Sequence, residues 1–116
     1  MPCGTPLPIR LDEQAIREFC VANDVGELAL FDSVLRADFG PESDVDILVR
    51  FRPGKRVSLI DLCQMEAALT PLVGGRAVDL RTVGDLHPAI QQRVLREREV
   101  LFDAHRLYIR RRIARR

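Results

Sequence analysis

The amino-acid sequence predicts an α+β fold, in which helices pack on a small mixed β-sheet. Segments with apolar residues at helical spacing alternate along the chain with short runs that are rich in β-branched residues. Of the 116 residues, 47% are hydrophobic and 30% are charged, which is typical of one globular domain and excludes a largely disordered chain. No apolar run approaches the ~18 residues that span a bilayer, and residues 1–10 lack the features of a signal peptide. We therefore expect one cytoplasmic domain, with no membrane contact.

The first elements should be a helix, a strand and a short helix. Residues 1–10 hold three of the seven prolines and predict an irregular lead-in to a domain over 11–105. Residues 12–23 predict a helix, because apolar side chains recur at helical spacing behind an acidic first turn: Ala15, Ile16, Phe19 and Cys20. Residues 27–31 favour a short buried strand, although their length alone leaves a helical turn open. Residues 33–38 could form a short helix ahead of Gly40-Pro41.

The middle of the chain contains the clearest strand. Residues 45–51 are rich in β-branched side chains and are closed by the turn Arg52-Pro-Gly54. Ser58 is a suitable N-cap for the next helix, which should reach about Leu72 before Gly74-Gly75. We expect that helix to present one apolar side, formed by Leu59, Leu62, Cys63 and Leu69.

The last elements should be a strand at 77–80 and a final helix. Pro88 fits the first position of that helix, and its apolar side should contain Ile90, Val94 and Leu101. The segment 106–116 is rich in arginine and is a candidate continuation of the helix, as a helical tail.

The three cysteines, Cys3, Cys20 and Cys63, do not indicate a disulfide framework or a zinc site, because the count is odd and none of them form a close pair. Cys20 and Cys63 lie in apolar-periodic segments, so we expect both to be buried as small hydrophobic residues.

The net charge of +1 conceals an uneven distribution. Six of the 18 basic residues lie in 106–116, where there is no acidic residue. The first 105 residues therefore carry 12 basic and 17 acidic side chains, a balance of −5. An acidic body with a cationic tail suggests contact of the tail with RNA or with a partner protein.

Acidic residues stand where strands should disfavour them. Asp46 lies in the clearest strand, and alternation along a strand places Asp44 on the same face. Asp79 lies in the next strand candidate, between Val78 and Leu80. If the two strands are neighbours, three carboxylates can converge and hold Mg²⁺, which suits phosphoryl or nucleotidyl transfer. The alternative is that these acids face solvent or cap a helix. The pattern alone favours neither the metal site nor this alternative.

The run from Leu30 to Val49 resembles the signature of the minimal nucleotidyltransferases, of the polymerase-beta-like superfamily. That signature is a hydrophobic residue, a Gly, a Ser or Gly, a spacer, and then Asp-hydrophobic-Asp-hydrophobic. Ser33 and the run Asp44-Val-Asp-Ile47 match it in order and spacing, and Asp79 corresponds to a third carboxylate on a later strand. The resemblance covers about residues 25–102 and implies a nucleotidyltransferase fold.

The resemblance also implies roles for individual residues. Asp44 and Asp46 would hold Mg²⁺ and, through it, the triphosphate of ATP. Asp79 would complete the metal site and could act as the base on the attacking hydroxyl. Ser33 would bond a phosphate oxygen, and Arg36 either steadies the triphosphate or is a solvated helix residue.

The sequence departs from the family pattern at Asp32, which stands where the family has glycine. Glycine allows close approach of the backbone to phosphates and conformations that other residues avoid. An aspartate adds a negative charge beside a polyanion, at a cost of about 1–4 kcal/mol at ~4 Å. Asp32 could weaken catalysis, turn away, or contribute to metal binding.

Two functions follow as expectations. The first is a Mg²⁺-dependent enzyme that moves AMP from ATP to a hydroxyl of a protein partner, since members of this family are commonly antitoxins of HEPN ribonucleases. The alternative is an antitoxin that neutralises its toxin by binding alone, because Asp32 weakens catalysis. RNA binding by the arginine-rich tail ranks last, since the acidic body would repel RNA.

Overall fold

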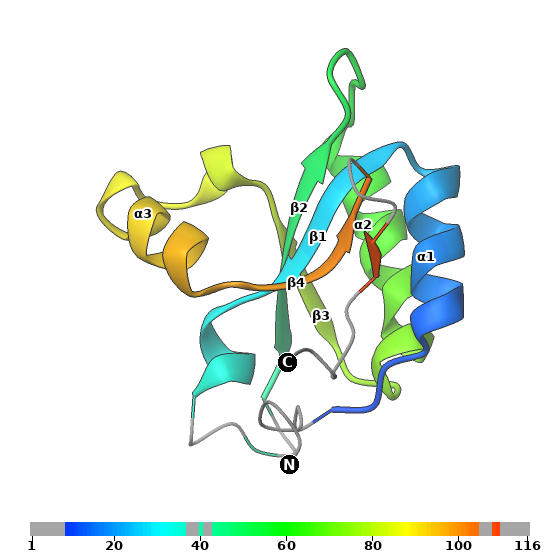
Figure 1. Cartoon of the computed structure of the whole chain (residues 1–116), viewed down its shortest axis with the longest axis horizontal. Helices are drawn as coiled ribbons and strands as arrows, with labels where there is room; N and C mark the ends of the chain where they lie inside the picture. Colours follow the sequence, from blue (N-terminus) through cyan, green and yellow to red (C-terminus); the bar gives the residue numbers. More distant parts are fainter. Residues whose placement is uncertain (1–8, 37–39, 41–42, 105–107, 110–116) are drawn as a thin grey trace.

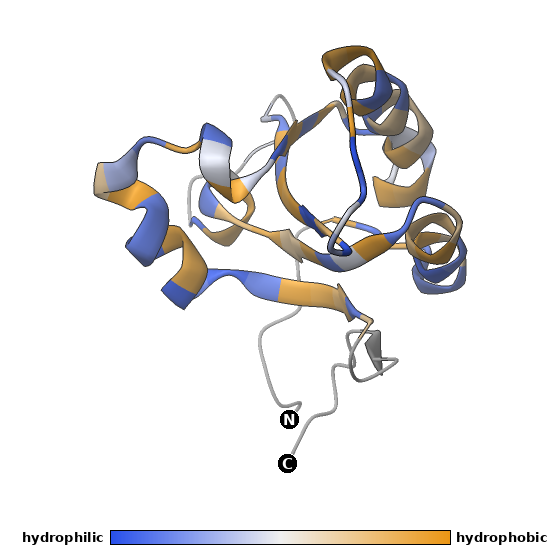
Figure 2. Ribbon diagram, turned by 90° about the horizontal axis from the view of Figure 1, so that it is seen from above, coloured by the Kyte–Doolittle hydropathy of each residue, from blue (hydrophilic) through white to orange (hydrophobic). Residues whose placement is uncertain are grey.

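The computed structural model describes residues 9–36, 40, 43–104 and 108–109, which form a β-sheet with helices on both faces (Figure 1). The sheet has five strands in the order β3-β2-β1-β4-β5. Seen from above, it separates α3 from the pair α1 and α2 (Figure 2). The predicted α+β class with a mixed sheet is confirmed. Among the residues described, no helix is long and apolar enough to cross a membrane.

β1 (Val25–Leu30) is the central strand. It pairs antiparallel with β2 (Val45–Phe51) on one side and with β4 (Glu99–Asp103) on the other. β3 (Val78–Arg81) lies parallel to β2 at one edge. β2 has the bounds that the sequence predicts, because its β-branched residues are buried: Val45, Ile47 and Val49.

α1 (Glu13–Ala22) begins after Asp12, whose carboxylate accepts a hydrogen bond from the Ala15 amide at 3.2 Å. Ile16 and Cys20 are buried against the sheet, as their spacing predicts. Burial raises the pKa of the Cys20 thiol to about 12, so this cysteine is an inert core residue.

α2 (Leu59–Leu69) begins with a capping box. The Asp61 amide donates to the Ser58 hydroxyl at 3.1 Å, and the Ser58 amide donates to the Asp61 carboxylate at 2.9 Å. The helix tightens into η2 (Thr70–Val73) and stops at Gly74, which has a φ of +77°.

The predicted apolar side of α2 is partly wrong. Leu59 is 79% exposed and Cys63 is also exposed, so Cys63 is not the buried cysteine that the sequence predicts. The helix meets the sheet with Met65 and Leu69, and Leu62 packs beside them. Leu59 and Cys63 therefore lie on the side of α2 that faces solvent.

The final helix, α3 (Pro88–Glu97), starts at Pro88 as predicted but ends at Glu97. Arg98 takes an extended backbone, and the chain continues as β4, in which Leu101 is buried. The predicted long helix is therefore wrong. The reason is tertiary, since β4 covers the second edge of β1, whose amide and carbonyl groups would otherwise lack strand partners.

The predicted helical tail over 106–116 lies mostly outside the described residues. Tyr108–Ile109 form the short strand β5, antiparallel to β4. At these two positions the chain is a strand and not a helix.

The two faces of the sheet carry separate apolar clusters. Alternate residues of β2 pack under α1 and α2 in the larger cluster. The other face carries a smaller cluster that holds α3 against the sheet, formed by Phe31, Leu48, Leu86 and Val94. Asp46 lies two residues before Leu48 on β2, and therefore shares the face of this smaller cluster.

Candidate functional site

Asp46 and Asp79 lie opposite each other on the parallel strands β2 and β3. Facing residues of adjacent strands point to the same side of a sheet, so the two carboxylates share the face that carries α3. Both residues are half-buried. The two strands are neighbours, which is the condition on which the predicted convergence depends, and the register places the two acids side by side.

Asp44 lies one residue before β2 and is exposed. The loop that leads to it is held by Arg76, whose guanidinium donates to the Gly40 carbonyl and, at 2.9 Å, to the Ser43 carbonyl. Sequence reasoning missed Arg76 because only the parallel pairing of β2 and β3 brings it to this loop.

Asp79 is engaged by Arg81, two residues further along β3. The Arg81 Nε lies 3.0 Å from Asp79 Oδ1, and its Nη2 lies 3.3 Å from Oδ2. This hydrogen-bonded pairing raises the pKa of Arg81, and the charges of Asp46 and Asp85 add to the effect. Arg81 thus acts as an internal cation among the acids of this face. In the sequence, the two-residue spacing of Arg81 from Asp79 was the one feature that could have indicated this contact, since residues two apart in a strand share a face.

The three predicted carboxylates do not form a metal-binding group in this conformation. Within the described ranges no three His, Cys, Asp or Glu side chains come close enough together to hold a metal ion. Two features account for this: Asp79 is turned onto Arg81, and Asp44 lies outside the strand. Asp46 and Asp79 lie side by side, and Asp44 stands at the entry to the strand. The assignment of these three residues to a metal site stays a prediction.

Asp32 adopts a backbone conformation that favours glycine. It follows β1 at the start of the 3₁₀ turn η1 (Asp32–Leu35) and has a φ of +54°. Aspartate is one of the few residues other than glycine that tolerate this left-handed region. The chain therefore places an aspartate in a backbone conformation that glycine adopts freely.

The carboxylate of Asp32 lies between two arginines. Its Oδ1 is 3.6 Å from Arg36 Nη1 and 3.8 Å from Arg93 Nη1, and Arg93 also lies 3.6 Å from Glu97. The sequence left open that Asp32 weakens catalysis, turns away or contributes to metal binding, and it did not predict these contacts with arginines. Arg93 belongs to α3 and was missed, because no local pattern marks it.

Ser33 follows Asp32 within η1, and its side chain lies outside what the structure describes. The turn that carries it is tied to the acids, since the Phe31 amide donates to the Asp46 carbonyl at 3.1 Å. This hydrogen bond places the predicted phosphate-binding turn beside the predicted metal ligands.

The model of the family described as "Nucleotidyltransferase domain" matches residues 13–101, which is most of the chain. The chain belongs to this nucleotidyltransferase family. The resemblance drawn from the motif of Ser33, Asp44 and Asp46 is thereby confirmed.

Individual nucleotidyltransferase relatives agree with this assignment. A Methanocaldococcus jannaschii protein named "Putative protein adenylyltransferase" is 37% identical over 73 residues, which cover 63% of this chain and 75% of the relative. A solved structure described as a "putative minimal nucleotidyltransferase" is 31% identical and has a TM-score of 0.60, with 74% of this chain and 85% of that chain covered. A toxin-antitoxin structure solved with AMP-PNP has a TM-score of 0.64 at 22% identity, with 80% and 74% covered; this likeness shows the fold.

The acidic face offers a donor set that suits Mg²⁺. This ion prefers carboxylate oxygens and usually shares them with substrate phosphates. Asp46 and Asp79 present such oxygens on one face of the nucleotidyltransferase sheet, and Asp44 stands at its entry. Arg81 competes with a metal ion for the Asp79 carboxylate.

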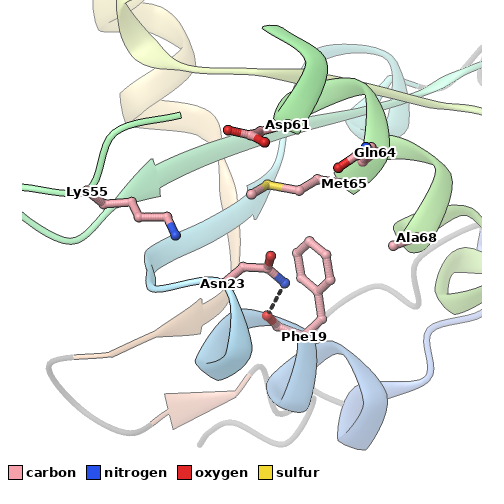
Figure 3. A pocket seen from close by; sticks show the side chains of 7 residues that line it. All are labelled: Phe19, Asn23, Lys55, Asp61, Gln64, Met65 and Ala68. Atoms are coloured by element: carbon pink, nitrogen blue, oxygen red, sulfur yellow. Dashed lines mark hydrogen bonds between the residues drawn. The ribbon is translucent and has the colours of Figure 1, made fainter. Parts of the chain in front are cut away.

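A pocket of about 340 Å³ lies elsewhere, where α1, α2 and the loop after β2 meet (Figure 3). Its lining mixes polar and apolar side chains: Phe19, Asn23, Lys55, Asp61, Gln64, Met65 and Ala68. Asp61 belongs to the capping box of α2, and hydrogen bonds from Ser58 lower its pKa. The Asn23 amide donates to the Phe19 carbonyl at 2.9 Å. These polar groups already serve the helix ends, and the pocket lies on the face of the sheet opposite the acids.

Proposed function

We propose that this nucleotidyltransferase transfers AMP from ATP to a hydroxyl group of a protein partner, with Mg²⁺ as cofactor. The observation that carries the proposal is the in-register pair Asp46 and Asp79, beside the turn that contains Ser33. The relative named as a protein adenylyltransferase supports a protein as the acceptor.

Each residue has a part in the proposed reaction. Asp44 and Asp46 would hold the metal ion, and Asp79 would complete the site. When bound, Mg²⁺ would neutralise phosphate charge and help to orient the α-phosphate for in-line attack. Asp79 takes the proton from the acceptor hydroxyl, whose oxygen forms the new bond to the α-phosphorus. The bond from the α-phosphorus to the bridging oxygen breaks, and pyrophosphate leaves with the electron pair.

The proposed partner is the toxin of a toxin-antitoxin pair, of the HEPN ribonuclease type. The structures described as toxin-antitoxin complexes support this class of partner. On this proposal the chain is an antitoxin of the cytoplasm, and its acceptor is a hydroxyl of the toxin.

A second candidate is neutralisation by binding alone. Two sets of ion pairs favour this candidate. Asp32 pairs with two arginines that could otherwise bind phosphate, and Arg81 pairs with Asp79, which could otherwise bind a metal ion. Nucleotide and metal would then have to displace these internal contacts.

The two candidates separate in one experiment. The chain is incubated with ATP, Mg²⁺ and a candidate HEPN-type toxin, and the intact mass of that toxin is measured. We expect the wild type and the control Asp24→Asn to add the mass of AMP, and Asp46→Asn to lose the activity by about 100-fold or more. The control is isosteric, and asparagine tolerates the left-handed conformation of Asp24. A toxin that gains no mass but is still neutralised would replace the enzyme with the binding-only antitoxin.

A further inference from the structure

Two arginines from distant parts of the chain approach one carboxylate oxygen. Arg36 comes from the segment after η1 and Arg93 from the middle of α3, and both approach Asp32 Oδ1, at 3.6 and 3.8 Å. Their side chains are 60% and 41% exposed, and the Asp32 side chain is 31% exposed. The arginines therefore face a surface that a ligand can reach.

The position of Arg93 is set by the packing of α3. The neighbouring Val94 is 2% exposed and lies in the apolar cluster with Phe31, Leu48 and Leu86. Phe31 directly precedes Asp32, so the same cluster holds both the helix and the turn. Figure 1 shows α3 and η1 on the side of the sheet away from α1 and α2.

This arrangement suits a phosphate oxygen. Guanidinium groups bind phosphate and carboxylate oxygens through the same charge-assisted hydrogen bonds. The turn that begins at Asp32 is also joined to the strand of Asp46, because the amide of the preceding residue, Phe31, donates to the Asp46 carbonyl. Arg93 also forms an ion pair with Glu97, which lowers the net positive charge around the two arginines.

We propose that Arg93 of α3 binds the polyphosphate chain of the nucleotide together with Arg36, for which the family resemblance already implies such a role. We propose further that the Asp32 carboxylate is an internal anion that this chain must displace. The proposal rests on the proposed function for the identity of the ligand. It gives α3 a part in binding the nucleotide through Arg93, which lies outside the motif between β1 and β2. It also gives Asp32 a physical effect, because Asp32 lowers affinity by competing for the arginines.

The probe is tripolyphosphate without metal, so that the acids play no part in the measurement. Binding to the full chain is measured by calorimetry in metal-free buffer, and thermal melting checks the fold of every variant. Asp32→Asn removes the competing charge and keeps a residue that tolerates a positive φ. Arg96→Gln is the matched control for Arg93→Gln, since Arg96 is an exposed arginine on the same helix.

We expect Asp32→Asn to bind tripolyphosphate about tenfold more tightly than the wild type, since one like charge beside the anion is removed. Arg93→Gln should bind about tenfold more weakly and Arg96→Gln like the wild type. The gain from Asp32→Asn should shrink in the double variant Asp32→Asn/Arg93→Gln, because the two residues act on the same site.

The inference is overturned if Arg93→Gln binds tripolyphosphate as Arg96→Gln does, or if Asp32→Asn has no effect. This result is separate from the transfer of AMP. A chain that shows the expected binding pattern but adds no AMP to a toxin would refute the proposed function alone. A chain that transfers AMP while Arg93→Gln binds normally would refute this inference alone.

Discussion

At the scale of single residues, the charged side chains of the candidate site form ion pairs with one another. Arg81 covers Asp79, and Asp32 lies between Arg36 and Arg93. Arginine and aspartate pairs at a partly exposed surface are weak, so a ligand of higher charge can replace them. The ligand-free protein thus avoids an uncompensated cluster of acids.

Replacing Arg81 should strengthen the binding of divalent cations. In Arg81→Gln the Asp79 carboxylate loses its internal cation, and we expect Mn²⁺ to bind about fivefold more tightly, since an exposed pair is worth about 1 kcal/mol. The measurement is the free Mn²⁺ signal by electron paramagnetic resonance, on the chain without nucleotide. Arg52→Gln, an exposed arginine in the turn after β2, serves as the control. Equal affinity in both variants would show that Arg81 does not compete with metal.

At the scale of elements, one ion pair holds the junction between α3 and β4 to the central strand. Arg98 donates from Nε and, at 3.3 Å, from Nη2 to the carboxylate of Glu27, and its Nη1 donates to the Leu95 carbonyl. The side chains are 23% and 12% exposed. This pair fixes the point where the helix ends and the strand begins.

Breaking that pair should destabilise the fold. We expect Arg98→Ala to lower the free energy of unfolding by about 3 kcal/mol, because it leaves the Glu27 carboxylate buried without its partner. Urea unfolding followed by circular dichroism measures the change, with Arg96→Ala in the last turn of α3 as the control. The double variant Glu27→Met/Arg98→Met should recover much of the loss, since it removes both charges together. If Arg98→Ala unfolds at the same urea concentration as the control, the ion pair does not stabilise the junction, and backbone pairing alone holds it.

At the scale of the whole molecule, the charge of the chain divides between the body and the arginine-rich tail. The acidic body includes Asp44, Asp46 and Asp79, which the proposed function assigns to a metal site. The tail lies mostly beyond the described residues, apart from the strand β5. On the proposed function, the body carries the nucleotide chemistry, and the tail is a candidate contact for the partner.

Removing residues 110–116 should separate these tasks. This truncation takes away five arginines and keeps β5, so the sheet remains complete. We expect weaker binding to the toxin and unchanged binding of ATP, with both measured by calorimetry. A truncated chain that binds the toxin with wild-type affinity would exclude the tail as a contact for the partner, and the same chain tested against an RNA oligonucleotide would show whether the tail binds RNA.

Much of the fold could be predicted because it depends on near neighbours. The strand 45–51 follows from its β-branched run, and the start of α2 follows from the capping box between Ser58 and Asp61. The spacing of Asp44, Asp46 and Ser33 likewise predicted the family. These features lie within a few residues of chain, where sequence and conformation are coupled directly.

The sequence by itself determined the class of fold, the family and the acids on β2 and β3. Only the tertiary structure decided that the chain leaves α3 at Glu97 to form β4, since that choice depends on the open edge of β1. It also decided that Cys63 faces solvent, and that Arg93 reaches Asp32. The physical reason is that helical spacing and capping act over about one turn, whereas strand pairing and long-range ion pairs depend on where distant segments finally lie.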